Sequence, residues 1–287
     1  MRRWFLVLML CCFGLAAGAQ NGTPAEADQE QALLDSLDAV SARYAPLDSL
    51  LTQFYATLER EDTETKNAEF DALIGSCRDS LTRQHVTFAV FDHYRYSRLM
   101  GEEAVAVHIY DEWIAPGRVP ARSEFELFEA ERFALENRST LIGMPAPRLT
   151  LRTPCGGRRT LPSDTRPAVL FFYSPHCAKC RLETHALPAV LADVEFPLDF
   201  FAIDVDTDRQ DFKAFRKALK TSKKNVKMIH LWDPKGESTL LLDYGVFSTP
   251  KVFVVWEGEI LGRRLEMDSL QEIIHYINLL YGQEKED

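Results

Sequence analysis

The feature that most constrains this chain is a run of large apolar residues leading directly into two cysteines with two residues between them. Residues 169–173 (VLFFY) are followed by a three-residue connection (SPH) and then by Cys177-Ala178-Lys179-Cys180. Apolar residues return at helical spacing from residue 177 to 191. A cysteine pair where a buried strand passes into a helix predicts an α/β fold with the first cysteine at the helix N-terminus.

This position gives the two cysteines different chemistry. Unpaired backbone N–H groups and the helix dipole stabilise a thiolate at a helix N-terminus, so we expect the pKa of Cys177 to fall from about 8.5 into the range of about 3.5 to 7.5. Cys180 lies one turn further along and is expected to be more buried and more protonated. The predicted order is attack by Cys177, followed by resolution of the mixed disulfide by Cys180.

The cysteine pair has two other interpretations. A structural zinc site needs four ligands, and the chain offers one such pair with only His176 and His185 nearby. A structural disulfide would be inert, whereas a two-residue loop at a helix start is where thiol exchange is fast. The pattern therefore favours a redox pair, and we expect no metal and no cofactor.

Short β-rich runs alternate with helical segments in the second half of the chain, residues 140–287. This alternation predicts a central mixed sheet flanked by helices. The strands are expected at 148–152, 168–173, 198–203, 228–232 and 251–256. The helices are expected at 177–191, 210–219 and 269–281.

The first half has a different texture. Helical spacing of apolar residues runs over 33–58, 70–81 and 125–135 and predicts an all-α domain at residues 20–139. Residues 20–139 carry 11 Lys and Arg against 23 Asp and Glu, whereas residues 140–287 carry 20 of each. An acidic half of this kind argues against nucleic acid and anionic membranes as partners.

The first 19 residues have the layout of a secretory signal. Arg2 and Arg3 precede an apolar run, and small residues follow at 17–19. The run is shorter than the roughly 20 residues that span a bilayer, so a membrane anchor is the weaker interpretation. We expect cleavage after Ala19 and an exported, periplasmic protein that is soluble once processed.

Further segments around the cysteine pair resemble the TlpA/ResA-like branch of the thioredoxin superfamily, which borders the AhpC/TSA peroxiredoxins. These are residues 142–147 (IGMPAP), 231–236 (LWDPKG), 244–246 (YGV) and 248–250 (STP), and the resemblance covers about 142–282. It implies a thioredoxin fold and thiol-disulfide exchange in the bacterial cell envelope, often in the reducing direction. Client proteins with disulfides or thiols and a membrane-bound electron donor are the implied partners.

The resemblance also implies roles for individual residues. Pro250 matches a cis-proline that lies against the cysteines, and Thr249 before it would offer its backbone to a client peptide; an ordinary trans proline is the alternative. Glu183 matches an acid that takes the proton of the second cysteine, although a surface glutamate paired with Lys179 is an equal alternative. His176 replaces the Trp that usually precedes the motif, so the docking surface beside it is expected to differ.

Two other functions remain open at this point. A peroxiredoxin-like peroxidase shares the segment 142–147, but such enzymes have a Thr three residues before the reactive cysteine, where this chain has Ser174. The third possibility is a redox-inactive protein-binding module of the cell envelope.

The remaining cysteines are expected to be unpaired. Cys77 falls on the apolar face of a predicted helix and should be an inert core thiol. Cys155 lies in a turn between two strands (PCGG) and should be exposed and open to modification.

Overall fold

The structure is a computed structural model that describes residues 42–163 and 166–283. The predicted signal peptide at 1–19 lies outside the described residues. The chain divides into two compact units, residues 1–60 and 61–287, and each is described by itself. In the first unit, residues 42–58 are helical, as the apolar spacing predicts. The predicted boundary at residue 139 stays a prediction.

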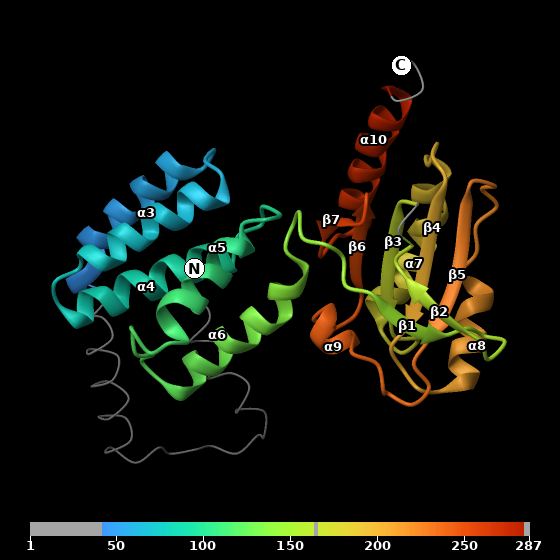
Figure 1. The fold of residues 1–287 in the computed structure, drawn as a ribbon, viewed down its shortest axis with the longest axis horizontal. Helices are drawn as coiled ribbons and strands as arrows, with labels where there is room; N and C mark the ends of the chain where they lie inside the picture. The colour runs from blue at the N-terminus through green and yellow to red at the C-terminus, as the bar shows by residue number, and fades with distance from the viewer. Residues whose placement is uncertain (1–41, 164–165, 284–287) are drawn as a thin grey trace, which may run out of the picture. The chain divides into compact units, whose positions relative to one another are not determined.

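The second unit begins with helices (Figure 1). They are α3 (Thr63–Ser76), α4 (Ser80–Arg95), α5 (Glu103–Ile109) and α6 (Glu124–Asn137), with a π-helical turn at Tyr110–Ile114 and a 3-10 turn at Arg138–Thr140. The predicted helix over 70–81 is wrong in one respect, because α3 ends before Cys77. Asp79 accepts a hydrogen bond from the Thr82 N–H (2.8 Å) and starts a new helix there.

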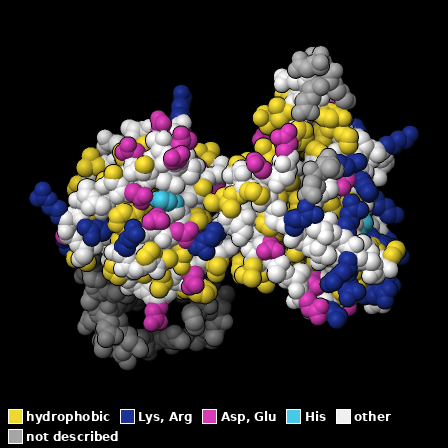
Figure 2. All heavy atoms as spheres, viewed as in Figure 1, with side chains coloured by type: hydrophobic (Ala, Val, Ile, Leu, Met, Phe, Trp, Pro, Cys, Tyr) yellow, Lys and Arg dark blue, Asp and Glu magenta, His cyan; other side chains and the backbone are white. Residues whose placement is uncertain are grey.

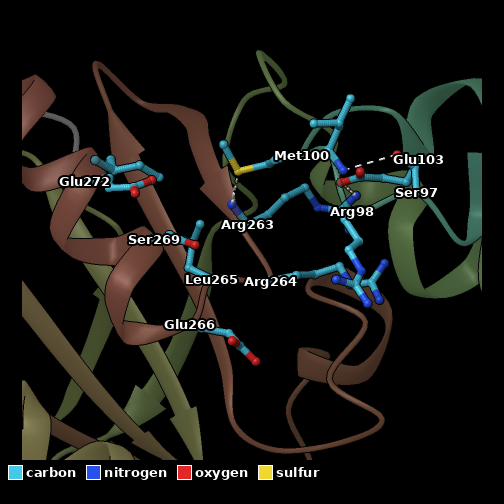
Figure 3. A pocket seen from close by; sticks show the side chains of 12 residues that line it. Ser97, Arg98, Met100, Glu103, Arg263, Arg264, Leu265, Glu266, Ser269 and Glu272 are labelled. Atoms are coloured by element: carbon cyan, nitrogen blue, oxygen red, sulfur yellow. Dashed lines mark hydrogen bonds and ion pairs between the residues drawn. The ribbon is translucent and has the colours of Figure 1, made fainter. Parts of the chain in front are cut away.

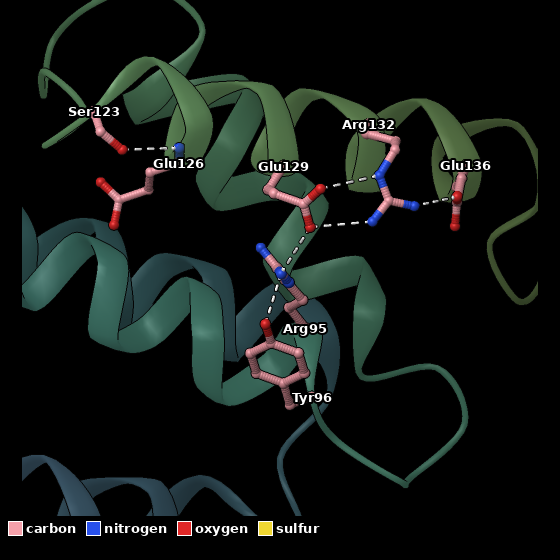
Figure 4. Close-up of polar contacts among 7 residues, drawn as sticks. All are labelled: Arg95, Tyr96, Ser123, Glu126, Glu129, Arg132 and Glu136. Carbon is pink, nitrogen blue, oxygen red and sulfur yellow. Dashed lines mark hydrogen bonds and ion pairs between the residues drawn. The ribbon is translucent and has the colours of Figure 1, made fainter. Parts of the chain in front are cut away.

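The helices share an apolar core and an ionic contact on their surface. Phe70 of α3 packs edge-on against Tyr94 of α4, with ring centroids 5.3 Å apart. Figure 4 shows Arg95 of α4 reaching Glu129 of α6 at 3.3 Å, while Arg132 bridges Glu129 and Glu136 along α6. The core fixes the helices, and these partly exposed ion pairs add little to it.

A seven-stranded mixed sheet follows in the order β2-β1-β5-β4-β3-β6-β7. Strands β3, β4 and β5 run parallel, whereas β1, β2, β6 and β7 each join antiparallel neighbours. The strands are β1 (Leu149–Arg152), β2 (Arg158–Leu161), β3 (Ala168–Tyr173), β4 (Leu198–Asp204), β5 (Val226–Trp232), β6 (Lys251–Trp256) and β7 (Glu259–Arg263). The helices are α7 (Ala178–Ala192), α8 (Arg209–Ala218), α9 (Leu240–Asp243) and α10 (Met267–Gln283).

The central strands are buried on both faces, which explains the unbroken apolar sequence of β3 and the apolar run at residues 200–203 of β4. Alternate residues of β3 enter two separate cores: Phe171 lies in one, with residues of α7, α8 and α10, and Phe172 in the other, with α9. Right-handed crossovers from β3 to β4 and from β4 to β5 place α7 and α8 on the same face. The predicted fold class, an all-helical region followed by an α/β sheet, is therefore confirmed.

Two strands and a short helix were not predicted. Strand β2 consists mainly of Arg and Thr, and β7 has a glycine and a charged end, so neither has the apolar run that marks the central strands. Both lie at the edges of the sheet. Their pairing is set by neighbours such as Leu149, opposite Leu161, and not by their own composition.

The last turn of α6 lies directly against the segment that leads to Pro250. Gly245 has a φ of 55°, and a Cβ there would overlap the backbone carbonyl of Glu136. Lys251 is buried and donates its Nζ hydrogen bond to the Gly245 carbonyl. Close packing against Glu136 and the hydrogen bond from Lys251 therefore fix the segment between α9 and β6 at Gly245.

Figure 2 shows Lys and Arg side chains gathered over the region of α8 and β5. The sequence from 212 to 227 contains no Asp or Glu. Its exposed cations are Lys213, Lys217, Lys220, Lys224 and Lys227. Within the described residues, none of the helices has both the length and the apolar character needed to cross a bilayer.

Candidate functional site

The cysteine pair stands at the junction of β3 and α7, as the sequence predicts. Cys177 is the N-cap of α7, and its Sγ accepts a hydrogen bond from the Cys180 N–H at 3.1 Å. This bond satisfies one of the N–H groups that a helix leaves free at its start. Both cysteines are free thiols; Cys177 is half-buried and Cys180 is buried. The more accessible sulfur is therefore the one at the helix N-terminus.

The two thiols differ in pKa in the predicted direction. Burial raises the pKa of Cys177, but the hydrogen bonds from the Cys180 side chain and backbone outweigh burial and lower it below its usual value. Burial raises the pKa of Cys180 to about 12, and the neighbouring Cys177 adds to this rise. Cys177 is thus the better thiolate, and Cys180 needs a proton acceptor before it can react.

Residues distant in sequence complete the site from the opposite side. The Thr249–Pro250 peptide bond is cis, as predicted. The Cys177 thiol donates to the Thr249 carbonyl oxygen across 3.3 Å. The segment before β6 therefore lies against the first cysteine, where a polypeptide bound to Cys177 would meet it.

Glu183 is buried on α7, one turn beyond Cys180, and its role as a base stays a prediction. Only 8% of the residue is exposed, and its Oε2 has no hydrogen-bond partner among the described residues. Lys179 Nζ lies 3.9 Å from Oε1. Burial raises the pKa of Glu183, and the charge of Lys179 opposes the rise. It is not an ordinary surface glutamate.

Lys179 connects the motif to a neighbouring cavity. Its Nζ lies 2.8 Å from Glu266, and this ion pair raises the pKa of Lys179. Glu266 lines a cavity of about 590 Å³ whose walls come from residues 97–103 and 263–273 (Figure 3). Neither cysteine lines this cavity. The Lys179–Glu266 ion pair links its wall to the motif.

The loop before Cys177 is more polar and more exposed than the rest of the site. His176 pairs with Asp211 of α8 at 3.0 Å, and 70% of its side chain is exposed. Ser174 donates to the Asp206 carboxylate at 2.6 Å and accepts from the His176 N–H at 3.1 Å. An exposed imidazole thus occupies the place beside the motif where a docking surface is expected.

Sequence analysis missed two buried polar groups near the motif. Tyr173 ends β3 and Asp204 ends β4, and both are fully buried. Asp204 lies in an alternating stretch, Ile203-Asp204-Val205-Asp206, that resembles a half-exposed strand end. No local signal distinguishes Asp204 from the more accessible Asp206 and Asp208 that follow it.

Cys77 and Cys155 are also free thiols. Cys77 is half-buried, not a core residue, and burial raises its pKa. Cys155 is exposed, as predicted. Within residues 42–163 and 166–283, no three His, Cys, Asp or Glu side chains are grouped so that they could hold a metal ion.

Fold and site together define a protein with a thioredoxin-like fold and a free Cys-X-X-Cys pair at the N-terminus of α7. A thioredoxin-like protein from Bacteroides caccae has a similar structure, with a TM-score of 0.59 and 16% identity over 81% of this chain and 84% of that one. This share is larger than residues 140–287 alone, so the similarity extends into the helical region.

Other solved structures match about half of this chain. The thioredoxin domain of a thiol-disulfide oxidoreductase from Bacteroides vulgatus covers 48% of this chain at 20% identity, with 99% of that chain covered and a TM-score of 0.43. StoA from Bacillus subtilis covers 44%, with 96% of that chain covered, at 20% identity and a TM-score of 0.35. No protein-family profile and no curated protein matches this chain.

Proposed function

We propose that this protein is a thiol-disulfide oxidoreductase that reduces disulfides of client proteins. The observation that carries the proposal is the position of Cys177 at the N-terminus of α7. Its Sγ accepts a hydrogen bond from the Cys180 N–H. The same sulfur lies against the Thr249 carbonyl, which precedes a cis proline. A half-buried thiol with a lowered pKa beside a buried thiol with a raised pKa supports sequential attack and resolution.

The reaction runs in two exchanges. The Cys177 thiolate attacks a client disulfide, an S–S bond forms between client and protein, and one client sulfur leaves as a thiolate. Cys180 then loses its proton to a base, attacks Cys177 Sγ, and expels the second client thiolate. Two electrons pass to the client, and the Cys177–Cys180 disulfide forms. A donor must then reduce this disulfide.

The remaining parts of the proposal rest on the sequence. The signal-like residues 1–19 support export to the periplasm after cleavage at Ala19. The resemblance to TlpA/ResA-like proteins supports the reducing direction and a membrane-bound electron donor. The exposed His176 and the Thr249 backbone are the groups we assign to client docking, and Glu183 is the proposed base for Cys180.

Reduction of insulin disulfides by the full chain tests the function. In the presence of a small dithiol, the wild-type protein should accelerate insulin precipitation, and Cys177→Ser should fall to the uncatalysed rate because the nucleophile is gone. Cys155→Ser is the matched control, since it removes an exposed thiol away from the motif, and it should retain full activity.

Two outcomes of this assay contradict the proposal. An inactive wild-type protein would favour a redox-inactive binding module. Peroxide turnover that depends on Cys177, without insulin reduction, would favour a peroxidase.

The Glu183→Gln variant tests the proposed base. Its Cys180 should resolve mixed disulfides about tenfold more slowly or worse at neutral pH, because general bases contribute 10²-fold or more. Burial raises the pKa of Glu183 in the folded protein, so ionising this carboxyl group lowers the free energy of unfolding. The loss begins above about pH 4.3, the pKa in the unfolded chain, and grows as the pH rises through the folded-state pKa.

Thermal unfolding at pH 4 and pH 8 provides the independent readout for this variant. Wild type should lose more stability than Glu183→Gln between these two pH values, since Gln stays neutral at both. A resolution rate and a pH dependence equal to wild type would assign Glu183 a purely structural role.

A further inference from the structure

The cavity of about 590 Å³ lies where the connection between α4 and α5 meets the connection between β7 and α10 (Figure 3). Its volume falls in the range of about 300–1,000 Å³ that is typical of ligand sites. Two contacts join its walls: the Arg263 backbone N–H donates to Met100 Sδ at 3.4 Å, and the Arg263 guanidinium donates to Glu103 at 2.6 Å. These contacts fix the two connections relative to each other.

Two arginines at this cavity are unpaired. Arg98 comes from the α4–α5 connection and Arg264 from the β7–α10 connection. Both are exposed, and neither forms a hydrogen bond or an ion pair with another described residue. Figure 3 shows their guanidinium groups reaching the same side of the cavity. Two cations that converge in this way favour an anionic group, and a guanidinium binds a carboxylate through two parallel hydrogen bonds.

The acidic residues that line the cavity do not neutralise these two cations. Glu103 is paired with Arg263 at 2.6 Å, and Glu266 is paired with Lys179 at 2.8 Å. Glu272 is exposed on α10, and Figure 3 shows it on the opposite side of the cavity from the two guanidinium groups. The side with the two unpaired arginines therefore keeps its positive charge.

Apolar side chains form much of the remaining wall. They are Leu99, Met100, Leu265 and Ile273. Leu99 is 58% exposed and Met100 is 46% exposed, so covering them removes apolar surface from water and favours binding. The ligand that fits this cavity therefore combines a carboxylate with an apolar group.

The cavity lies beside the segment that faces Cys177. The Leu265 N–H donates to the Val252 carbonyl at 3.4 Å, and Val252 is two residues after Pro250. The Thr249 carbonyl accepts from the Cys177 thiol at 3.3 Å. An extended chain advances about 3.3 Å per residue and neighbouring strands lie about 5 Å apart, so a polypeptide joined to Cys177 reaches the cavity within roughly five residues.

We propose that this cavity binds a segment of the client polypeptide in which an acidic residue stands beside an apolar residue, roughly five residues from the client cysteine. The carboxylate accepts hydrogen bonds from Arg98 and Arg264, and the apolar side chain packs on Met100 and Leu265. A polypeptide is favoured over a free small acid because the cavity adjoins the segment assigned to client docking. The inference rests on the proposed function and specifies which clients react fastest.

The test uses two peptides whose single cysteine forms a mixed disulfide with a coloured aromatic thiol. One peptide carries Glu-Leu about five residues to either side of its cysteine, and the other carries Gln-Leu at the same positions. The reduced full chain, with Cys77→Ser and Cys155→Ser in every protein compared, reacts with each peptide below saturation. The Cys177 thiolate attacks the peptide sulfur, a disulfide forms between them, and the aromatic thiolate leaves.

The reference protein should react about five- to tenfold faster with the Glu peptide, because charge-assisted hydrogen bonds hold it at the cavity. The formal net charge of the chain is −10, which disfavours an acidic peptide, so this preference requires a local positive site. The preference should shrink in about 1 M salt, because salt screens the exposed guanidinium groups.

The variant Arg98→Gln/Arg264→Gln should react with the two peptides at rates that agree within about twofold, and its rate with the Gln peptide should equal that of the reference protein. Arg78→Gln/Arg158→Gln is the matched control. It removes the same charge from two exposed arginines that do not line the cavity, and it should keep the preference for the Glu peptide.

The two proposals fail in different ways. Absence of thiolate release from both peptides contradicts the proposed function; fluorescence anisotropy with labelled peptides that carry Ser in place of Cys then still tests binding at the cavity. Normal release at equal rates from the two peptides contradicts the cavity assignment alone. A preference that survives in Arg98→Gln/Arg264→Gln, or that disappears equally in Arg78→Gln/Arg158→Gln, also overturns it.

Discussion

Replacing Cys180 with Ser is expected to leave most of the protein covalently joined to its clients. Cys177 keeps its position at the start of α7, so attack and formation of the mixed disulfide proceed. The resolving thiol is gone, and a serine hydroxyl cannot displace a disulfide sulfur, so the intermediate persists. The joined complexes should appear as high-mass bands on non-reducing gels of cell extracts, and these bands should disappear when a reductant is added.

The reciprocal variant provides the control. Cys177→Ser retains the buried Cys180 thiol, and burial, the largest cause of its raised pKa, remains, so little of that thiol is ionised at neutral pH. It should trap almost no client. Equal trapping by both variants, or trapping by Cys177→Ser alone, would reverse the assigned roles of the two cysteines.

A large loss of stability is expected from Arg263→Met. Arg263 is completely buried in β7, and its guanidinium donates to Glu103 at 2.6 Å and to Asn137 at 2.7 Å. Removing the cation leaves Glu103, itself only 8% exposed, as an unpaired buried charge. Breaking a buried pair in this way typically costs about 3–5 kcal/mol of the free energy of unfolding. Chemical denaturation of the full chain measures the change.

Arg264→Met is the matched control, because Arg264 is the adjacent, exposed arginine. Its substitution should change the free energy of unfolding by about 0.5 kcal/mol or less. The double variant Glu103→Gln/Arg263→Met should recover part of the loss, since the uncompensated charge is removed. An Arg263→Met protein as stable as Arg264→Met would show that the buried pair contributes nothing net.

Sequence reasoning worked where local signals carry the structure. The apolar runs of β3, β4 and β6 predicted the central strands because these strands are buried on both faces and only the ends of β4 and β6 carry polar residues. It failed at β2 and β7, where edge strands depend on their partners. It also failed at Cys77, because the Asp79 cap divides a continuous apolar periodicity into two helices.

For Glu183 the sequence left two interpretations equal. The spacing of three residues from Cys180 fits both a base and a surface residue paired with Lys179. The structure buries Glu183 and also places Lys179 Nζ 3.9 Å from it, so its role as a base stays a prediction. Its burial depends on what packs over the first turns of α7. Glu183 is 8% exposed because of that packing, which no feature of residues 177–191 specifies.

The sequence by itself determined the cysteine pair, its place at a strand-to-helix junction, and the proline that faces it, because each has a local signature in residue type and spacing. Only the tertiary structure decided that Asp204 and Arg263 are buried. Asp204 lies under the motif because the β3–β4 register places it beside Tyr173, 31 positions earlier. Arg263 is enclosed because α5 and α6 supply Glu103 and Asn137 from more than 100 positions away. Burial of a charged residue is set by such long-range contacts, and local sequence carries no record of them.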